Sequence, residues 1–348
     1  MDSLWQNFKL AARLGKPQEI PVALIVDSPW LPGYANIDTR DYYLFPDKWL
    51  KINKSLFTRF PGIVWIPGFW VEYGMAIEPS AFGGIRLRIH PDSPPDIEPL
   101  VPDIDFWAKT EPINPEEDGL MPLALRMYEV METRLRAEGL GIKMVCARGP
   151  MVLASWQVGI TPLMMALISN PDSVSKVLET MSTSIIRWLN AQLAVLKDPE
   201  GIMLLDDVVG MVSLPHYEEL IAPHLKRIFS EFDGLIRIYH NDTPCIQLYA
   251  ALSEANFEVF NFSHEVNIRE ARALMGHRVA LMGNVPPLDV GVRGTPDDVY
   301  RAAQKCLEEG GGYDGIILSF GGGVSPGTPA ENIDMLTKAV QDYQSAPK

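Results

Sequence analysis

Eight short apolar runs that lack polar–apolar alternation constrain the fold of this chain more than any other feature. A strand with one solvated face alternates, whereas a strand of a parallel sheet covered on both faces reads as a continuous apolar segment. Turn residues or polar residues follow each run. The runs are Ile20–Val26, Gly62–Ile66, Ile142–Cys146, Ile202–Leu205, Leu235–Tyr239, Phe257–Phe262, Val279–Met282 and Ile316–Ser319.

Helical segments separate these runs. Apolar residues recur at helical spacing from Pro171 to Leu196, and Asn170 stands at the N-cap position of this segment. Two further helix starts begin at Thr295 and Thr328, each with a capping Thr, a Pro at the first helical position and an acidic residue that can complete a capping box. Gly310 is placed to end the first of these two helices.

Strands that alternate with helices predict a parallel sheet, and about eight of them favour closure into a (β/α)8 TIM barrel. The alternative is a doubly wound open sheet, which gains no support because no GxGxxG motif follows the first strand. We expect one domain over residues 1–348, with an N-terminal helical extension and an irregular, proline-rich insertion at about residues 91–123.

The charge and the cysteines argue against several classes of protein. A formal net charge of -14 argues against a nucleic-acid-binding protein, which needs a basic face. Cys146, Cys245 and Cys306 form no CxxC pair, so we expect no disulfide framework and a reducing, cytoplasmic location. Residues 1–16 lack the apolar core of a signal peptide, and we expect no membrane-spanning segment.

In a barrel of this kind, functional residues lie at the carboxyl ends of the strands. These ends carry Asp27, Trp70, Arg148, Asp206, Asp207, His240, Asp242, His264, Asn284 and Gly321–Gly323. Among them we expect function first of His240, because it ends a strand beside Asp242. His264 is expected to be structural, and one of Asp206 and Asp207 is expected to cap a loop.

Several segments carry motifs of known enzymes. "GPMVLASWQVG" (residues 149–159) is similar to a segment of decarboxylases and of methylcobalamin:coenzyme M methyltransferases that belong to the uroporphyrinogen decarboxylase superfamily. "LLDDVVGMVSLPHYEELIAPHLKRIF" resembles the stretch in which an acidic pair ends a strand, and "LMGNVPP" and "ILSFGGGVSPGTPAENI" resemble the C-terminal third of the superfamily. Together with the weaker match "SPWLPGY" (residues 28–34), the resemblance covers most of the chain and implies the TIM barrel.

Two departures from the patterns of the superfamily bear on the reaction. Its decarboxylases carry arginines in the N-terminal signature that bind substrate carboxylates, whereas the residues near Ile25 and Pro29 are apolar here. Apolar residues cannot replace bidentate arginines, so we do not expect porphyrinogen decarboxylation. The coenzyme M methyltransferases hold zinc through His-x-Cys and a later Cys, where this chain has His240-Asn-Asp242 and Gly322. Two of three ligands lose their sulfur, so we do not expect activation of a thiol.

The remaining activity of the superfamily is methyl transfer from a substrate to a corrinoid. The chain is similar to the substrate methyltransferases of anaerobic phenyl methyl ether O-demethylases, which implies demethylation of an ether such as guaiacol or veratrole. The resemblance implies a cobalt(I) corrinoid (cobalamin) on a corrinoid-binding partner protein as acceptor. No nucleic acid or membrane partner is expected, and a homodimer is considered. The alternatives are a non-catalytic binding module and a lyase that decarboxylates another acid.

This chemistry assigns candidate roles at the strand ends. Expelling a phenolate into a dry pocket is costly, so the leaving oxygen needs a proton or an electrostatic partner. We expect His240, Asp242, Asp206 and Asp207 to supply it, as acids or through a bound metal, for which zinc is considered. Corrinoid ether demethylases have been suggested to use a Glu/His metal set, and Glu219 precedes His240 with twenty residues between them.

The aromatic residues and the glycine run complete the expected site. A flat aryl substrate would fit aromatic side chains, although any one of them can equally belong to the core. Glycines allow a close approach of the corrinoid, although they can also simply turn the chain. We expect substrate contacts from Phe69, Trp70, Tyr73, Trp156 and Tyr239, and corrinoid contacts from Gly321, Gly322 and Gly323.

Overall fold

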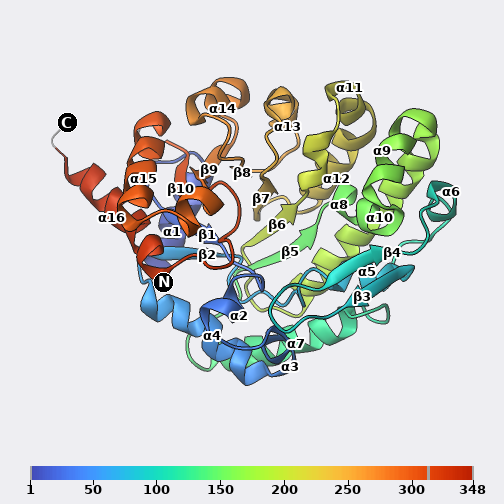
Figure 1. The fold of residues 1–348 in the computed structure, drawn as a ribbon, viewed down its shortest axis with the longest axis horizontal. Coiled ribbons are helices and arrows are strands. Elements are labelled where there is room, and N and C mark those ends of the chain that lie inside the picture. The colour runs from blue at the N-terminus through green and yellow to red at the C-terminus, as the bar shows by residue number, and fades with distance from the viewer. Residues whose placement is uncertain (1, 312–313, 347–348) are drawn as a thin grey trace.

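A computed structural model describes residues 2–311 and 314–346 of the chain (Figure 1). Its core is one sheet of eight parallel strands, hydrogen-bonded in the order β2-β1-β10-β9-β8-β7-β6-β5. Each predicted apolar run forms one of these strands, so the predicted strands are confirmed. They are β1 (Val22–Ile25), β2 (Ile63–Ile66), β5 (Met144–Arg148), β6 (Gly201–Leu205), β7 (Ile236–Asn241), β8 (Val259–Phe262), β9 (Ala280–Val285) and β10 (Ile316–Phe320).

The sheet curls into a nearly closed barrel with helices around it, which confirms the predicted TIM-barrel fold (Figure 1). Every residue of the eight strands is buried, and this double-sided burial explains why the runs show no alternation. In the described part of the chain, β2 and β5 are the two ends of the sheet and have no hydrogen-bonded ladder between them. We name this gap between β2 and β5 the seam.

Helices of varied length follow most of the strands. They are α1 (Asp2–Ala12), α2 (Leu31–Tyr34), α3 (Thr39–Leu44), α4 (Pro46–Arg59), α5 (Ile77–Phe82), α6 (Ile104–Trp107), α7 (Met121–Arg136), α8 (Pro150–Val158), α9 (Ile160–Ser169), α10 (Pro171–Ala194), α11 (Leu214–His216), α12 (Ala222–Glu231), α13 (Tyr249–Leu252), α14 (Ile268–Met275), α15 (Pro296–Gly310) and α16 (Ala330–Ser345). No single described helix is long and apolar enough to cross a membrane. By length and composition, α8 and α9 meet that criterion only as a pair, bent by 107°.

The helix ends test four predicted start and stop signals. The Asn170 side chain caps α10, and Thr295 forms the predicted capping box with Asp298 at the start of α15, which ends at Gly310 as expected. The predicted start at Thr328 is wrong by one residue. Its hydroxyl donates to the Ser325 carbonyl oxygen instead of capping α16, whose N-cap is Pro329.

The proline-rich segment at about 91–123 contains regular structure that its composition did not indicate. Strand β4 (Asp96–Pro99) pairs with β3 (Ile85–Arg88) as an antiparallel hairpin outside the barrel sheet, and α6 follows it (Figure 1). Arg86 and Glu98 pair across the hairpin at 2.9 Å. Cross-strand charge pairs of this kind help to stabilise a short hairpin in an otherwise irregular segment.

Candidate functional site

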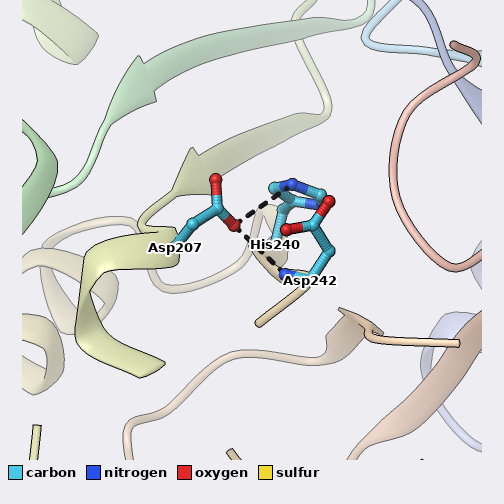
Figure 2. Close-up of side chains that lie close together, drawn as sticks. All are labelled: Asp207, His240 and Asp242. Atoms are coloured by element: carbon cyan, nitrogen blue, oxygen red, sulfur yellow. Dashed lines mark hydrogen bonds and ion pairs between the residues drawn. The ribbon is translucent and has the colours of Figure 1, made fainter. Parts of the chain in front are cut away.

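Three ionisable side chains from two adjacent strands meet at the carboxyl end of the barrel (Figure 2). His240 lies near the end of β7 and Asp242 follows that strand, while Asp207 follows β6 as the first residue of the 3-10 helix η1 (Asp207–Met211). Ligand atoms from the three residues lie within 4.8 Å of one another. The His240 Nε2 atom is 3.4 Å from Asp207 Oδ1, which also accepts the Asp242 backbone N–H at 3.1 Å. We name these residues the Asp–His–Asp group.

Asn261 on β8 determines which nitrogen of the His240 ring carries a proton. Its amide nitrogen donates to the carbonyl oxygens of Met282 and Phe320, at 2.8 and 3.0 Å. Carbonyl oxygens only accept hydrogen bonds, so the amide oxygen of Asn261 must be the atom that faces His240 Nδ1, 2.7 Å away. Nδ1 therefore donates its proton to Asn261. Nε2 is therefore the ring nitrogen left to face the carboxylates, and it is the one that a metal would bind.

The composition of the Asp–His–Asp group fits a divalent cation. Burial raises the pKa of Asp242, the His240 ring opposes that effect, and the Asp207 carboxylate raises it further. A cation between the two carboxylates would relieve this repulsion. Carboxylate oxygens and an imidazole nitrogen are ligands of zinc and related divalent metals. Asp207, His240 and Asp242 are therefore the residues that could hold a metal here.

Asp206 does not belong to this group, although it precedes Asp207 in the chain. Its fully buried carboxylate accepts the backbone N–H groups of Met151 and Val152, at 3.2 and 2.7 Å, at the start of α8. Burial raises the pKa of Asp206 to about 8, against the effect of these two hydrogen bonds. The structure therefore gives Asp206 a helix-capping role apart from the Asp–His–Asp group, and its predicted part in catalysis stays a prediction.

Tyr239 also lies outside the site. Its side chain is fully buried and packs on Phe229 of α12, Phe257 and Phe260, with ring centroids 6.0, 5.2 and 5.8 Å away. Consecutive residues of a strand point to opposite faces of the sheet. His240 points into the barrel, so its neighbour Tyr239 points outward, toward the helices. The prediction that Tyr239 contacts substrate is therefore wrong.

The other predicted aromatic residues have varied surroundings. Phe69 stacks on Phe57 at 5.1 Å, and both line a cavity of about 330 Å³ beside the seam. The Trp70 ring lies 4.9 Å from the Arg148 guanidinium, Tyr73 packs edge-on against Tyr43, and Trp156 is partly buried on α8. Substrate contacts from Phe69, Trp70, Tyr73 and Trp156 stay predictions.

The chain itself requires two of the three glycines that follow β10. A Cβ atom on Gly321 would lie 2.6 Å from the backbone nitrogen of His264. A Cβ atom on Gly322, where φ is +139°, would lie 2.9 Å from Asp242 Oδ2. Gly322 thus lies against the Asp–His–Asp group. Contact of Gly321, Gly322 and Gly323 with a corrinoid stays a prediction.

One predicted metal ligand is misplaced, and one important residue was not predicted. Glu219 is exposed on the π-helix η2 (Tyr217–Ile221) and is absent from the one group of described residues that could hold a metal. The prediction of a metal set with Glu219 is therefore wrong.

Asn261 was missed, although an amide inside the apolar run Phe257–Phe262 was a visible signal.

A second charged cluster lies where the carboxyl ends of β1, β2 and β5 meet. Arg148 ends β5, and its Nη2 atom is 3.1 Å from Glu72 Oε2. Glu78 on α5 accepts the Arg148 backbone N–H at 3.0 Å. Burial raises the pKa of Asp27 well above its usual value, Glu72 adds to the increase, and Arg148 opposes it. Glu72 and Glu78 were not predicted. We name these four residues the Arg148 cluster.

Comparisons with known proteins place these observations in a family and a fold. The family model described as "Uroporphyrinogen decarboxylase (URO-D)" matches residues 33–343. Uroporphyrinogen decarboxylases of Thermus thermophilus and Carboxydothermus hydrogenoformans are 27% and 26% identical over 267 and 274 residues, covering 74% and 75% of this chain and 75% of each relative. The solved structure of a methyltransferase from Methanosarcina mazei has a TM-score of 0.82 at 18% identity, with 98% of this chain and 99% of that chain covered.

Proposed function

Since this chain belongs to the uroporphyrinogen decarboxylase family, we propose that it is a methyltransferase that removes the methyl group of a small donor. The donor is a phenyl methyl ether such as guaiacol or veratrole, and the acceptor is the cobalt(I) corrinoid of a partner protein. The similarity of the fold to a methyltransferase from Methanosarcina mazei supports methyl transfer as the class of reaction.

The observation that carries this proposal is the Asp–His–Asp group. By the resemblance of the sequence, it stands where the coenzyme M methyltransferases hold zinc through two cysteines, yet it offers only oxygen and nitrogen atoms. Such ligands can still hold zinc, and without thiolates they favour an oxygen-containing substrate over a thiol. Decarboxylation of a polycarboxylate is disfavoured, because Arg148 at the carboxyl end of β5 is already paired with Glu72.

The proposed reaction places its main demand on the ether oxygen. The C–O bond to the methyl group breaks and its electron pair stays on oxygen, while the methyl carbon bonds to the nucleophilic cobalt(I). Negative charge that develops on oxygen in a dry site is costly unless it is stabilised. Asp207, His240 and Asp242 would hold a divalent metal such as zinc, which supplies a Lewis acid for that oxygen when bound. Asn261 keeps the His240 ring in the tautomer with a free Nε2.

An anaerobic assay tests the function. The purified protein is mixed with a cobalt(I) corrinoid protein of known competence and, separately, with guaiacol, veratrole, methanol and glycine betaine. We expect loss of the cobalt(I) absorbance with the aryl ethers alone, together with release of catechol from guaiacol. If no donor transfers a methyl group, the proposal is wrong. Transfer from methanol or glycine betaine alone would retain the methyltransferase and reject the aryl ether.

Paired variants test the site. Replacing both His240 and Asp242 by alanine should lower the rate of methyl transfer about 100- to 1000-fold, as expected for losing the group that stabilises a leaving oxygen. The same variant should lose bound zinc by elemental analysis. His277→Ala, an exposed histidine, is the control and should retain both rate and zinc. An unchanged rate in the double variant would place the chemistry elsewhere.

A further inference from the structure

We infer that Glu72 makes this barrel select uncharged methyl donors over donors that carry a carboxylate, because it occupies the guanidinium of Arg148. The inference rests on the proposed function, since it takes the carboxyl end of the barrel as the donor site. Glu72 and Arg148 are both buried, with exposed fractions of 5% and 6%, so their ion pair lies out of bulk solvent.

The Arg148 cluster lies within reach of a donor held at the Asp–His–Asp group. Arg148 is in register with Leu205 on β6, and Leu205 is in register with His240 on β7. Residues in register on neighbouring parallel strands point to the same face, so Arg148 and His240 both point into the barrel near its carboxyl end. They are two strands apart, which is about 10 Å between backbones. A substituted benzene ring can bridge side chains across that distance.

Glu72 holds the guanidinium in place from the other side of the seam. Its Oε2 atom is 3.1 Å from Arg148 Nη2, and its Oε1 atom accepts the backbone N–H of Ser28. The guanidinium also lies over the Trp70 ring at 4.9 Å. Arg148 Nε is buried without a hydrogen-bond partner, so this arginine has an unused donor. Without Glu72, the guanidinium would be free to bind an incoming carboxylate through two hydrogen bonds.

The charges of the Arg148 cluster oppose a further anion. Glu72 pairs with the Arg148 guanidinium, Glu78 accepts the Arg148 backbone N–H, and Asp27 lies close enough for Arg148 to favour its ionised form. A donor carboxylate would be a fourth carboxyl group in this buried region. A carboxylate buried without a counter-ion is strongly disfavoured, whereas a hydroxyl or methoxy group carries no such penalty.

Binding of two demethylated products, measured without cobalt, tests the inference. Catechol and protocatechuate share the same dihydroxy ring and differ by one carboxylate. By calorimetry at pH 7, the wild type should bind protocatechuate at least about 100-fold more weakly than catechol. Glu72→Gln keeps the shape of the side chain and removes the negative charge that pairs with Arg148. It should strengthen protocatechuate binding at least about tenfold while catechol binding changes less than about twofold.

The matched control is Glu98→Gln, the same substitution at a partly exposed glutamate of the β3–β4 hairpin. It should leave the ratio of the two affinities unchanged. Circular dichroism establishes that each variant is folded, and Glu72→Ala replaces Glu72→Gln if the latter does not fold. The inference is overturned if wild-type protein binds protocatechuate as well as catechol, if it binds neither, or if folded Glu72 variants keep the wild-type ratio.

These outcomes are separable from those of the proposed function. Selective binding of catechol without methyl transfer from guaiacol would reject the function and retain the role of Glu72. Methyl transfer at equal rates from guaiacol and its carboxylated analogue vanillate would retain the function and reject the role of Glu72.

Discussion

The amide of Asn261 connects three strands inside the barrel through one side chain. It accepts from His240 on β7 and donates to the carbonyl oxygens of Met282 on β9 and Phe320 on β10. The same amide group therefore contributes to the stability of the barrel and determines that the Nδ1 atom of His240 carries a proton. A buried donor or acceptor left without a partner costs about 1–3 kcal/mol.

We predict that Asn261→Leu lowers the free energy of unfolding by about 2–4 kcal/mol, because three buried polar groups lose their partner. Zinc affinity should fall about 10- to 100-fold, because the His240 ring loses the acceptor that orients it. Urea denaturation and zinc titration against a competing chelator measure the two effects. Asn190→Leu, at an exposed position of α10, serves as the control. Unchanged zinc affinity in the Asn261 variant would contradict the assigned tautomer.

Among the elements, helix α15 begins with the most complete local signal in the chain. The Thr295 hydroxyl accepts the backbone N–H of Asp298, and the Asp298 carboxylate accepts the backbone N–H of Thr295 at 2.9 Å. We predict that Thr295→Ala lowers the free energy of unfolding by about 1 kcal/mol, because one N-terminal N–H group loses its partner. Thermal or urea denaturation measures it. Thr295→Ser retains the hydroxyl and should stay within about 0.3 kcal/mol of wild type. Equal losses in both variants would reject the cap as the cause.

The seam shows that charge pairing can connect strands that lack a hydrogen-bonded ladder. Arg148 at the end of β5 and Glu72 after β2 form an ion pair across it. The pair joins the two ends of the sheet at the carboxyl side of the barrel, where substrate is expected. This one ion pair thus helps to close the barrel, and it also neutralises Arg148 at the end of the barrel where substrate is expected.

At the scale of the whole molecule, an ion-pair network attaches the N-terminal helix to the barrel. Glu200, just before β6, accepts from Lys143 at 2.7 Å and from Lys9 of α1. Burial opposes ionisation of Glu200, but the two ammonium groups outweigh it and lower the pKa of this carboxyl to about 2. Because the folded pKa lies below that of the unfolded chain, ionised Glu200 stabilises the fold above about pH 4.5.

We predict that Glu200→Gln is less stable than wild type at pH 7 by about 1 kcal/mol, a small effect because the pair is partly solvated. The difference should shrink as the pH falls from about 4.5 toward 2, where Glu200 of the folded wild type becomes protonated. Urea denaturation at a series of pH values measures this. A difference that stays constant over that range would show that the loss is not electrostatic.

Part of the candidate site could be predicted because chemistry concentrates at the strand ends of a barrel. His240, Asp242 and Asp207 come together as that rule implies. Glu72 was missed because it follows its strand by several residues, in a loop whose path no local pattern reveals. Glu219 was misplaced for a related reason. A fixed number of intervening residues says nothing about distance in space when a helix and a loop lie between them.

By itself, the sequence determined the eight strands, the main helices and the barrel, because apolar runs, caps and glycines act over a few neighbouring residues. Only the tertiary structure decided which strand-end residues meet. His240 points into the barrel and Tyr239 toward the helices, and Asp207 joins the site while Asp206 caps α8. The physical reason is that both faces of every barrel strand are buried. Their apolar runs therefore carry no alternation that could reveal which residues point inward.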